Sequence, residues 1–354
     1  MKDKKFLHFL TDTTSGMAKG LFATLIIGTI ISTIAKFIPD DTFIYSALYS
    51  LSNVLKMMTG AGIGIGIALS LKQDGLKLVS LGISGQIASF MAGSWSRSDG
   101  KFSYDFLTFG FKIGDPLTVY FVVVLTAVLM ILILKKATAV DIILIPLFAI
   151  CVSAVLTVLL SYPIAFITQV FGAFINEMTN AHPFVFGILI SILMGMALTA
   201  PISSAAIAVA FSINGLAGGA AVCGCCVQML GFAIQSIKDN KIGTVISVGI
   251  GTSMLQFKNI VKKPIVWLPT IIASAILGPI TTCIFKTTCT PAGAGMGTSG
   301  LVGIFGVLDS MESSGNVILL NIILGLIVLP ISLVFIIDKL FRHFNIIKNG
   351  DLTI

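Results

Sequence analysis

Three short runs rich in glycine, serine and threonine interrupt otherwise apolar sequence, and their hydroxyl and backbone groups could bind a polar solute. The runs are 199–204, 251–256 and 294–303. The apolar segments beside them are long enough to cross a bilayer. At that depth, unpaired backbone N–H and C=O groups are tolerated only where protein buries them or where they line a cavity that contains water. The three runs therefore predict the walls of one binding cavity.

Hydrogen-bonding residues in these runs are the candidate solute ligands. They are Ser203, Ser204, Thr252, Ser253, Gln256, Gly297, Thr298 and Ser299. Glu177 and His182 are added because they lie at the mouth of the sixth apolar segment, where they could hydrogen-bond a polyhydroxylated or anionic solute. A solvated interface loop explains these two residues equally well. For Gln228, inside an apolar segment, a hydrogen bond to a neighbouring helix is the better interpretation.

Chemistry other than solute binding finds no support in the residue patterns. Residues 295–300 satisfy G-x-G-x-x-G, but a dinucleotide fingerprint requires a preceding strand and a βαβ unit. The same run is similar to the loop after the phosphocysteine of lactose-type IIB phosphocarriers, yet Ala292 occupies the cysteine position and cannot carry phosphate. No Ser/His/Asp set, carboxylate pair or P-loop lysine can be assembled. We therefore expect no catalytic residue on this chain.

The six cysteines form neither a disulfide framework nor a zinc pattern. Cys223, Cys225 and Cys226 could ligate a metal, but no partner cluster of Cys or His lies at zinc spacing. Cysteines inside apolar runs behave as small hydrophobic residues. We expect these three to pack between helices, and we expect no metal and no cofactor.

The composition is that of an integral membrane protein. Of 354 residues, 56% are hydrophobic and 10% are charged, and the mean hydropathy is +1.04, whereas about a quarter of the residues of soluble domains are charged. Apolar segments of spanning length are 17–38, 43–70, 76–94, 116–134, 140–162, 183–211, 214–237, 242–257, 264–286 and 317–341. The predicted fold class is all-α, a polytopic membrane protein of about ten transmembrane helices with broken or re-entrant segments.

The net charge is +7, and the positions of the basic residues indicate how the chain is oriented in the bilayer. Lysines stand singly or in pairs at segment ends, not in a stripe with aromatic residues, which argues against nucleic acid. The basic residues that flank these spans include Lys2, Lys4, Lys5, Lys19, Lys72, Lys77, Lys135, Lys136, Lys258, Lys262, Lys263, Lys339, Arg342, His343 and Lys348. With an even number of spans they share one side, and the positive-inside rule predicts that both termini are cytoplasmic. Lys238 and Lys241 fall on the other side in this arrangement.

We expect a single transmembrane domain, 1–354, with three parts. We expect 15–165 to serve as a scaffold or dimerisation half, 180–305 to hold the solute site, and 315–341 to form the last span. Pro163 is predicted to break the fifth span, so that 163–181 lies along the interface or re-enters. Glycine-rich 60–66 and 215–221 predict close helix packing, although 60–66 could also interrupt a helix beside a site.

Several of these motifs together resemble one known family. They are 114–116, 140–143 with Pro146, 198–207, 251–256, Asn259 with Pro264, and 295–303. Jointly they are similar to the membrane subunit IIC of the phosphoenolpyruvate-dependent sugar phosphotransferase system, in its second, toxin-regulator type family. The similarity extends from about residue 15 to about residue 340.

The resemblance implies a bacterial inner-membrane homodimer that moves a sugar or related small polar solute. Separate IIA and IIB phosphocarrier proteins would phosphorylate the solute, so this chain is at most the membrane component of a phosphotransferase. The chain lacks the Gly-Ile-Thr-Glu motif whose glutamate binds sugar in the better known IIC proteins. Two alternatives stay open: a sensor or regulator that acts through a cytoplasmic partner, and an ion-coupled secondary transporter.

Overall fold

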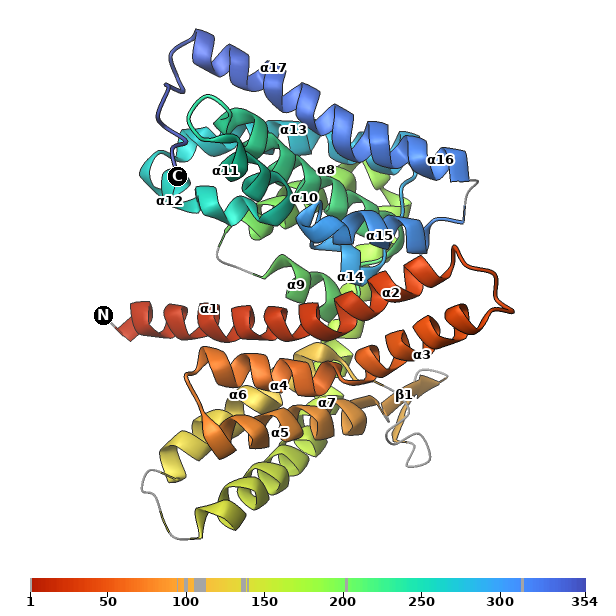
Figure 1. Ribbon diagram of the computed structural model, residues 1–354, viewed down its shortest axis with the longest axis vertical. Coiled ribbons are helices and arrows are strands. Elements are labelled where there is room, and N and C mark those ends of the chain that lie inside the picture. Colours follow the sequence, from red (N-terminus) through yellow and green to blue (C-terminus); the bar gives the residue numbers. More distant parts are fainter. Residues whose placement is uncertain are drawn as a thin grey trace. The chain divides into compact units, whose positions relative to one another are not determined.

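The computed structural model describes residues 2–93, 95–98, 101–104, 113–134, 138, 140–200, 203–312 and 315–354. Helices make up most of the described chain (Figure 1), which confirms the predicted all-α polytopic class. The chain divides into two units, Met1–Val170 and Phe171–Ile354. Lys135 and Lys136, and positions 201 and 202 of the first polar run, lie outside the described residues.

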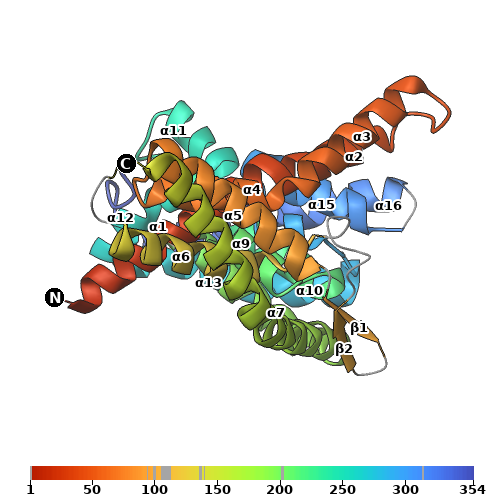
Figure 2. The same ribbon diagram turned by 90° about the horizontal axis from the view of Figure 1, so that it is seen from below.

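The first unit is a helical bundle whose order follows the apolar segments. Its elements are α1 (Lys2–Leu21), η1 (Phe22–Ile26), α2 (Ile27–Ala35), α3 (Phe43–Met57), α4 (Thr59–Ser70), α5 (Gly75–Gly93), β1 (Trp95–Ser98), β2 (Lys101–Tyr104), α6 (Pro116–Ile133) and the first part of α7 (Asp141–Ala181). α3 and α4 are bent by 50° relative to each other. α2 and α3 run side by side in both views (Figures 1 and 2), and β1 pairs antiparallel with β2.

Glycines let the helices of the first unit approach closely. A Cβ added at Gly20 of α1 would lie 2.3 Å from the carbonyl oxygen of Gly62 in α4, and one at Gly64 would lie 2.3 Å from the carbonyl oxygen of Leu81 in α5. α4 is continuous through its glycines, so packing, not interruption, explains 60–66. At the start of α6, Asp115 accepts a hydrogen bond from the Leu117 backbone N–H at 3.0 Å, as a helix cap does.

α7 is longer than the sequence predicted. The helix continues through Pro146 and Pro163 to Ala181, so the predicted break at Pro163 and the separate segment 163–181 are wrong. Proline is tolerated inside membrane helices because neighbouring helices, hydroxyl side chains and small local adjustments re-satisfy the freed backbone groups.

The second unit surrounds one buried helix, α10 (Gly215–Ser236). The elements before it are α8 (Pro183–Thr199) and α9 (Ser204–Ala210). Those after it are α11 (Ile242–Ile246), η3 (Ser247–Gly251), η4 (Ser253–Gln256), α12 (Phe257–Lys262), η5 (Pro264–Trp267), α13 (Leu268–Pro279), η6 (Ile280–Phe285), α14 (Pro291–Ala294), η7 (Ser299–Leu301), α15 (Val302–Ser310), α16 (Gly315–Leu320), η8 (Asn321–Val328) and α17 (Leu329–His343). α8, α13 and α17 pack on α10. Its glycines permit this, since a Cβ at Gly224 would lie 1.9 Å from the Ser191 carbonyl oxygen of α8.

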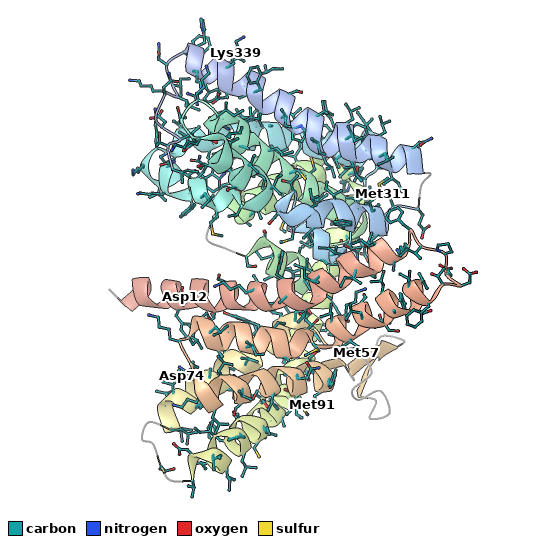
Figure 3. All side chains as sticks on the ribbon, in the orientation of Figure 1. Asp12, Met57, Asp74, Met91, Met311 and Lys339 are labelled. Atoms are coloured by element: carbon teal, nitrogen blue, oxygen red, sulfur yellow. The ribbon has the colours of Figure 1, made fainter. Side chains whose placement is uncertain are left out.

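Two segments of this unit are hairpins that enter and return at the same end. Asn240 and Asn259 stand at the two ends of the first hairpin, 242–262, and both hydrogen-bond the segment 352–353. The second hairpin, 286–310, is closed by a bond of 3.0 Å between Ser310 Oγ and Thr288 Oγ1. Figure 3 labels Met311 and Lys339, which lie toward opposite ends of this unit. The second hairpin ends beside Met311, and the segment that the first hairpin bonds follows α17, which carries Lys339. The two hairpins therefore approach from opposite ends of the unit.

The third returning segment is formed by α8 and α9. The Asn176 side chain, shortly before α8, donates to the Ser212 carbonyl at 3.1 Å, so the start of α8 and the end of α9 lie near the same end. Among the described residues, seven helices are long and apolar enough to span a membrane, or eight when the bent pair α3 and α4 counts as one span. The predicted segments 183–211 and 242–257 are the remaining two of ten.

The first hairpin corrects the predicted topology. α11 and η3 together are about 15 Å long at 1.5 Å per residue, half of the roughly 30 Å hydrocarbon core, so 242–257 is not a separate crossing. Asp239 accepts hydrogen bonds from the backbone N–H groups of Gly350 and Leu352. Lys238 and Lys241 consequently lie at the same end as the segment that follows the last span, and their predicted placement on the opposite side is wrong.

Candidate functional site

The turns of the three returning segments meet beside α10. Thr199, the last residue of α8, and Ser253, the first residue of η4, are joined by a hydrogen bond of 2.8 Å between their hydroxyl groups. Both residues are fully buried. Thr199 ends α8 and Ser253 begins η4, so the pair links the first polar run to the second.

The first and third runs are also bonded to each other. The Ser204 hydroxyl donates to the Gly295 carbonyl at 2.6 Å, while Ser203 caps α9 by accepting the Ala206 backbone N–H at 3.1 Å. Gly295 is needed for this approach, since a Cβ there would lie 2.3 Å from the Ser204 carbonyl oxygen. The two runs are therefore in direct backbone contact.

The tips of the two hairpins are joined by threonine and serine hydroxyls. Thr298 Oγ1 donates to the Gly249 carbonyl at 2.6 Å and Ser299 Oγ donates to the Gly251 carbonyl at 2.8 Å. Both acceptors lie in the last residues of η3, where a helix end leaves carbonyls without intrahelical donors. Thr252 caps the following turn by accepting the Met254 N–H at 3.2 Å. The hydroxyls of Thr298 and Ser299 thus donate to backbone carbonyls that the helix end leaves without partners. Their oxygen lone pairs can still accept hydrogen bonds from a solute.

Gly297 sets the distance between the third run and α10. Its φ of +55° is in the left-handed region, and a Cβ would lie 2.7 Å from the Cys225 carbonyl carbon. The Gly297 carbonyl accepts the Gly303 N–H at 2.9 Å, which closes the run into a compact turn. Gly297 therefore serves the site through its backbone.

A polar cluster around Gln228, which was not predicted from the sequence, lies next to these turns. Gln228, in the middle of α10, accepts hydrogen bonds at its Oε1 from Trp267 Nε1 at 2.9 Å and from Thr270 Oγ1 at 3.0 Å, with Thr199 Oγ1 at 3.3 Å. These bonds join α10 to neighbouring helices, as predicted for Gln228. Trp267 and Thr270 were not predicted from the sequence as partners of Gln228. The indole at the start of an apolar helix could have indicated this cluster, because a buried indole N–H requires an acceptor.

Gln256 has a different role from the one predicted. Its Nε2 donates to the Leu352 carbonyl at 3.0 Å and its Oε1 accepts from Asn259 Nδ2 at 2.7 Å, so both ends of the buried amide are engaged. Gln256 anchors the segment 346–354 to the first hairpin. No local pattern in the sequence predicts that this segment folds back.

The segment 346–354 is held by side chains and by apolar burial. Asn240 donates to the Leu352 carbonyl at 2.8 Å and accepts the Ile354 N–H at 2.9 Å. The side chains of Ile347 and Leu352 are 1% and 0% exposed, in a cluster that includes Val248 of the first hairpin. The segment therefore braces the hairpin that carries Ser253.

An ion pair adds an electrostatic contact to this brace. Burial alone would raise the pKa of the Asp351 carboxyl, but hydrogen bonds from the Lys263 ammonium and the Lys348 backbone N–H, together with the Lys263 charge, lower it below its ordinary value of 3.8. The carboxylate is therefore the stable form in the docked segment.

The structure does not bring Glu177 and His182 to these turns. Both are exposed, Glu177 near the end of α7 and His182 immediately before α8. α8 is about 25 Å long at 1.5 Å per residue and separates His182 from Thr199. Of the ten predicted residues, seven gather at the turns. Gln256 lies in the second run, but its amide bonds Leu352 and Asn259, and Glu177 and His182 lie away from the turns.

The cysteines of α10 pack as small side chains. Cys223, Cys225 and Cys226 are fully buried, and Cys225 Sγ lies 3.6 Å from the Met194 carbonyl and 3.8 Å from the Ala294 carbonyl. Among the described residues, no group of three or more His, Cys, Asp or Glu side chains could hold a metal ion. The site is built from neutral hydroxyl, amide and indole groups.

Comparison with known proteins confirms the resemblance seen in the sequence. Residues 11–354 match the family model described as "Phosphotransferase system, EIIC". A search of curated proteins finds no match to this chain.

Proposed function

We propose a function from one premise: the chain belongs to the EIIC family of the phosphotransferase system, whose model it matches over residues 11–354. It is thus a multi-pass membrane component of such a system. We propose that it translocates a sugar or related small polar solute, which partner proteins phosphorylate.

One observation supports this proposal most strongly, the convergence of three broken segments on neutral hydrogen-bonding groups at the centre of the second unit. Thr199 and Ser253 are bonded at 2.8 Å, and Thr298 and Ser299 bond the tip of the facing hairpin. Transporters commonly place substrate where discontinuous helices from opposite sides meet. Two hairpins that touch through a few hydrogen bonds can separate and rejoin around a solute, one from each side.

The proposed substrate ligands are Ser203, Ser204, Thr252, Ser253, Thr298 and Ser299, with the backbone of Gly297. Separate IIA and IIB phosphocarriers are the proposed partners, because this chain has no thiolate in a phosphocarrier loop. We also propose a homodimer in the bacterial inner membrane. The end that carries Lys238, Lys241 and Lys263 is the proposed cytoplasmic end, since the positive-inside rule places lysine-rich loops there.

Uptake by purified protein in liposomes tests the function. A panel of labelled hexoses, hexitols, disaccharides and sugar acids is offered with and without added phosphocarrier proteins. We expect saturable accumulation of at least one neutral solute, increased by the phosphocarriers. If alanine at Thr252, Ser253, Thr298 and Ser299 left uptake and binding unchanged, the site assignment would be wrong.

The same assay separates the two alternative functions. Saturable binding without accumulation, under every condition, would favour a sensor or regulator. Uptake driven by a proton or sodium gradient and indifferent to the phosphocarriers would favour an ion-coupled transporter.

A further inference from the structure

Gln228 carries a buried amide nitrogen that has no hydrogen-bond partner among the described residues. Its side chain is 0% exposed, and Nε2 is unpaired although it has two N–H donors. A buried donor without an acceptor is destabilising. A bound molecule with an acceptor oxygen would satisfy it.

The orientation of this amide is fixed by its neighbour. Trp267 Nε1 lies 2.9 Å from the amide oxygen, and an indole N–H can only donate. Turning the amide over would place two donors face to face. The nitrogen of Gln228 must therefore point away from Trp267, so its unpaired state does not come from an exchange of the amide oxygen and nitrogen.

The oxygen of the same amide is surrounded by more donors than it can use. Trp267, Thr270 and Thr199 all lie within 3.3 Å of Oε1, whereas an amide oxygen has two lone pairs. Thr199 is the longest of the three contacts, and its hydroxyl also lies 2.8 Å from Ser253 Oγ. Thr199 is therefore the hydroxyl that can turn toward a ligand without leaving the amide oxygen unpaired.

The chemistry of the surroundings restricts the ligand. The described side chains bonded in this cluster are those of Thr199, Ser253, Trp267 and Thr270, and all four are uncharged. A carboxylate or ammonium would meet no counter-charge among them, and burying an unpaired charge is costly. A hydroxyl group fits both partners, since it can accept from the Gln228 amide and donate to the Ser253 or Thr199 oxygen.

We propose that Gln228, with Thr199 and Ser253, forms a subsite that binds a hydroxyl group of a neutral sugar or polyol, with the Gln228 amide nitrogen as the donor. The half-buried Trp267 side chain is bonded to the same amide through its indole N–H. This subsite rests on the proposed function and identifies the class of solute: uncharged, with at least one hydroxyl that both accepts and donates.

The chain offers a direct reporter for this subsite. It contains two tryptophans, Trp95 and Trp267, so Trp95→Phe leaves Trp267 as the only source of indole emission. The full-length variant in lipid nanodiscs is titrated with D-glucose, D-galactose, D-mannose, D-mannitol and D-gluconate. We expect saturable change of the emission with at least one neutral compound, and a weaker response or none with D-gluconate.

Substitutions then test the amide itself. Gln228→Met removes the amide donors together with the amide oxygen, and Gln228→Glu keeps an acceptor for Trp267 and Thr270 while replacing the two amide N–H donors by at most one carboxyl O–H. Each is expected to raise the dissociation constant about tenfold or more, the loss of one to two hydrogen bonds. Gln235→Met is the matched control, because Gln235 lies on the same helix, is 1% exposed and also has an amide without a hydrogen-bond partner in the described part of the chain, but lies two turns from Gln228. The control is expected to bind within twofold of the parent.

The outcomes divide as follows. Unchanged affinity in Gln228→Met or Gln228→Glu, an equal loss in Gln235→Met, preference for D-gluconate, or no response to any compound would overturn the subsite. If Gln228→Met does not fold, Gln228→Glu alone decides. Binding that depends on Gln228 but is never followed by uptake in liposomes would refute the transport function and leave the subsite standing.

Discussion

Replacing Thr298 by valine tests whether the two hairpin tips are held together by hydrogen bonds. Valine has nearly the same shape but removes the hydroxyl that donates to the Gly249 carbonyl at 2.6 Å. Thr298 is 3% exposed and Gly249 is buried, so water does not easily replace the lost donor. An unpaired buried carbonyl costs about 1–3 kcal/mol, and we expect a loss of about 2 kcal/mol in the free energy of unfolding.

Ser299→Ala is the matched comparison. It removes the neighbouring bond to Gly251 at 2.8 Å, but Ser299 is half-buried and Gly251 is exposed. Because neither group is fully buried, water can replace that bond, so we expect a loss of at most about 0.5–1 kcal/mol, the net value of an ordinary hydrogen bond.

The assay is reversible unfolding in mixed micelles, accompanied by hydrogen exchange of residues 247–253 in the folded protein. Thr298→Val is expected to lower the unfolding free energy more than Ser299→Ala and to speed exchange in 247–253. Equal losses in the two variants would refute the argument from burial. No change in either would show that the hairpin tips do not depend on these hydroxyls.

Three further predictions concern the brace and the close approach at α10. Asn240→Ala removes two hydrogen bonds to the segment 346–354, worth about 2 kcal/mol together, and we expect roughly thirtyfold faster amide exchange at Leu352; unchanged exchange would contradict the brace. The pKa of Asp351 is lowered in the docked segment, so its contribution is present above the ordinary value of 3.8 and is lost as the pH falls further. Protection of Leu352 should therefore decline below about pH 4 in the parent but not in Asp351→Asn, and equal decline in both would exclude Asp351 as the cause. Gly297→Ala adds left-handed strain of about 1–2 kcal/mol and a clash with α10, so solute uptake should fall at least tenfold while the protein still inserts; unimpaired uptake would show that the run need not approach α10 so closely.

Much of the architecture followed from apolar length and local composition. The segments near 76–94, 116–134 and 214–237 match α5, α6 and α10 closely, because membrane depth demands about 20 apolar residues and helices satisfy their own backbone. The three polar runs were recognised for the same reason, since broken backbone is unusual at that depth. Their mutual contact was predicted, and the bond between Thr199 and Ser253 is an instance of it.

Other features depend on tertiary contacts that local sequence does not encode. Pro163 looked like a helix end, yet α7 continues through it. Residues 242–257 were apolar enough to suggest a crossing, and only the bonds of Asn240 and Asn259 to the same segment show a hairpin. Gln256 was predicted to be a solute ligand because it follows Thr252 and Ser253. Its actual partner, Leu352, is almost a hundred residues away and could not be foreseen from the local sequence. Long-range pairing of this kind leaves no periodic pattern in the sequence.

Solute-dependent hydrogen exchange tests most directly whether the three turns form the solute site. The protein in nanodiscs is measured with and without the compound that gives the strongest saturable uptake in liposomes. We predict that added protection concentrates in 199–204, 247–256 and 295–303. Protection confined to the first unit, or to the exposed corner at Glu177 and His182, would contradict the account.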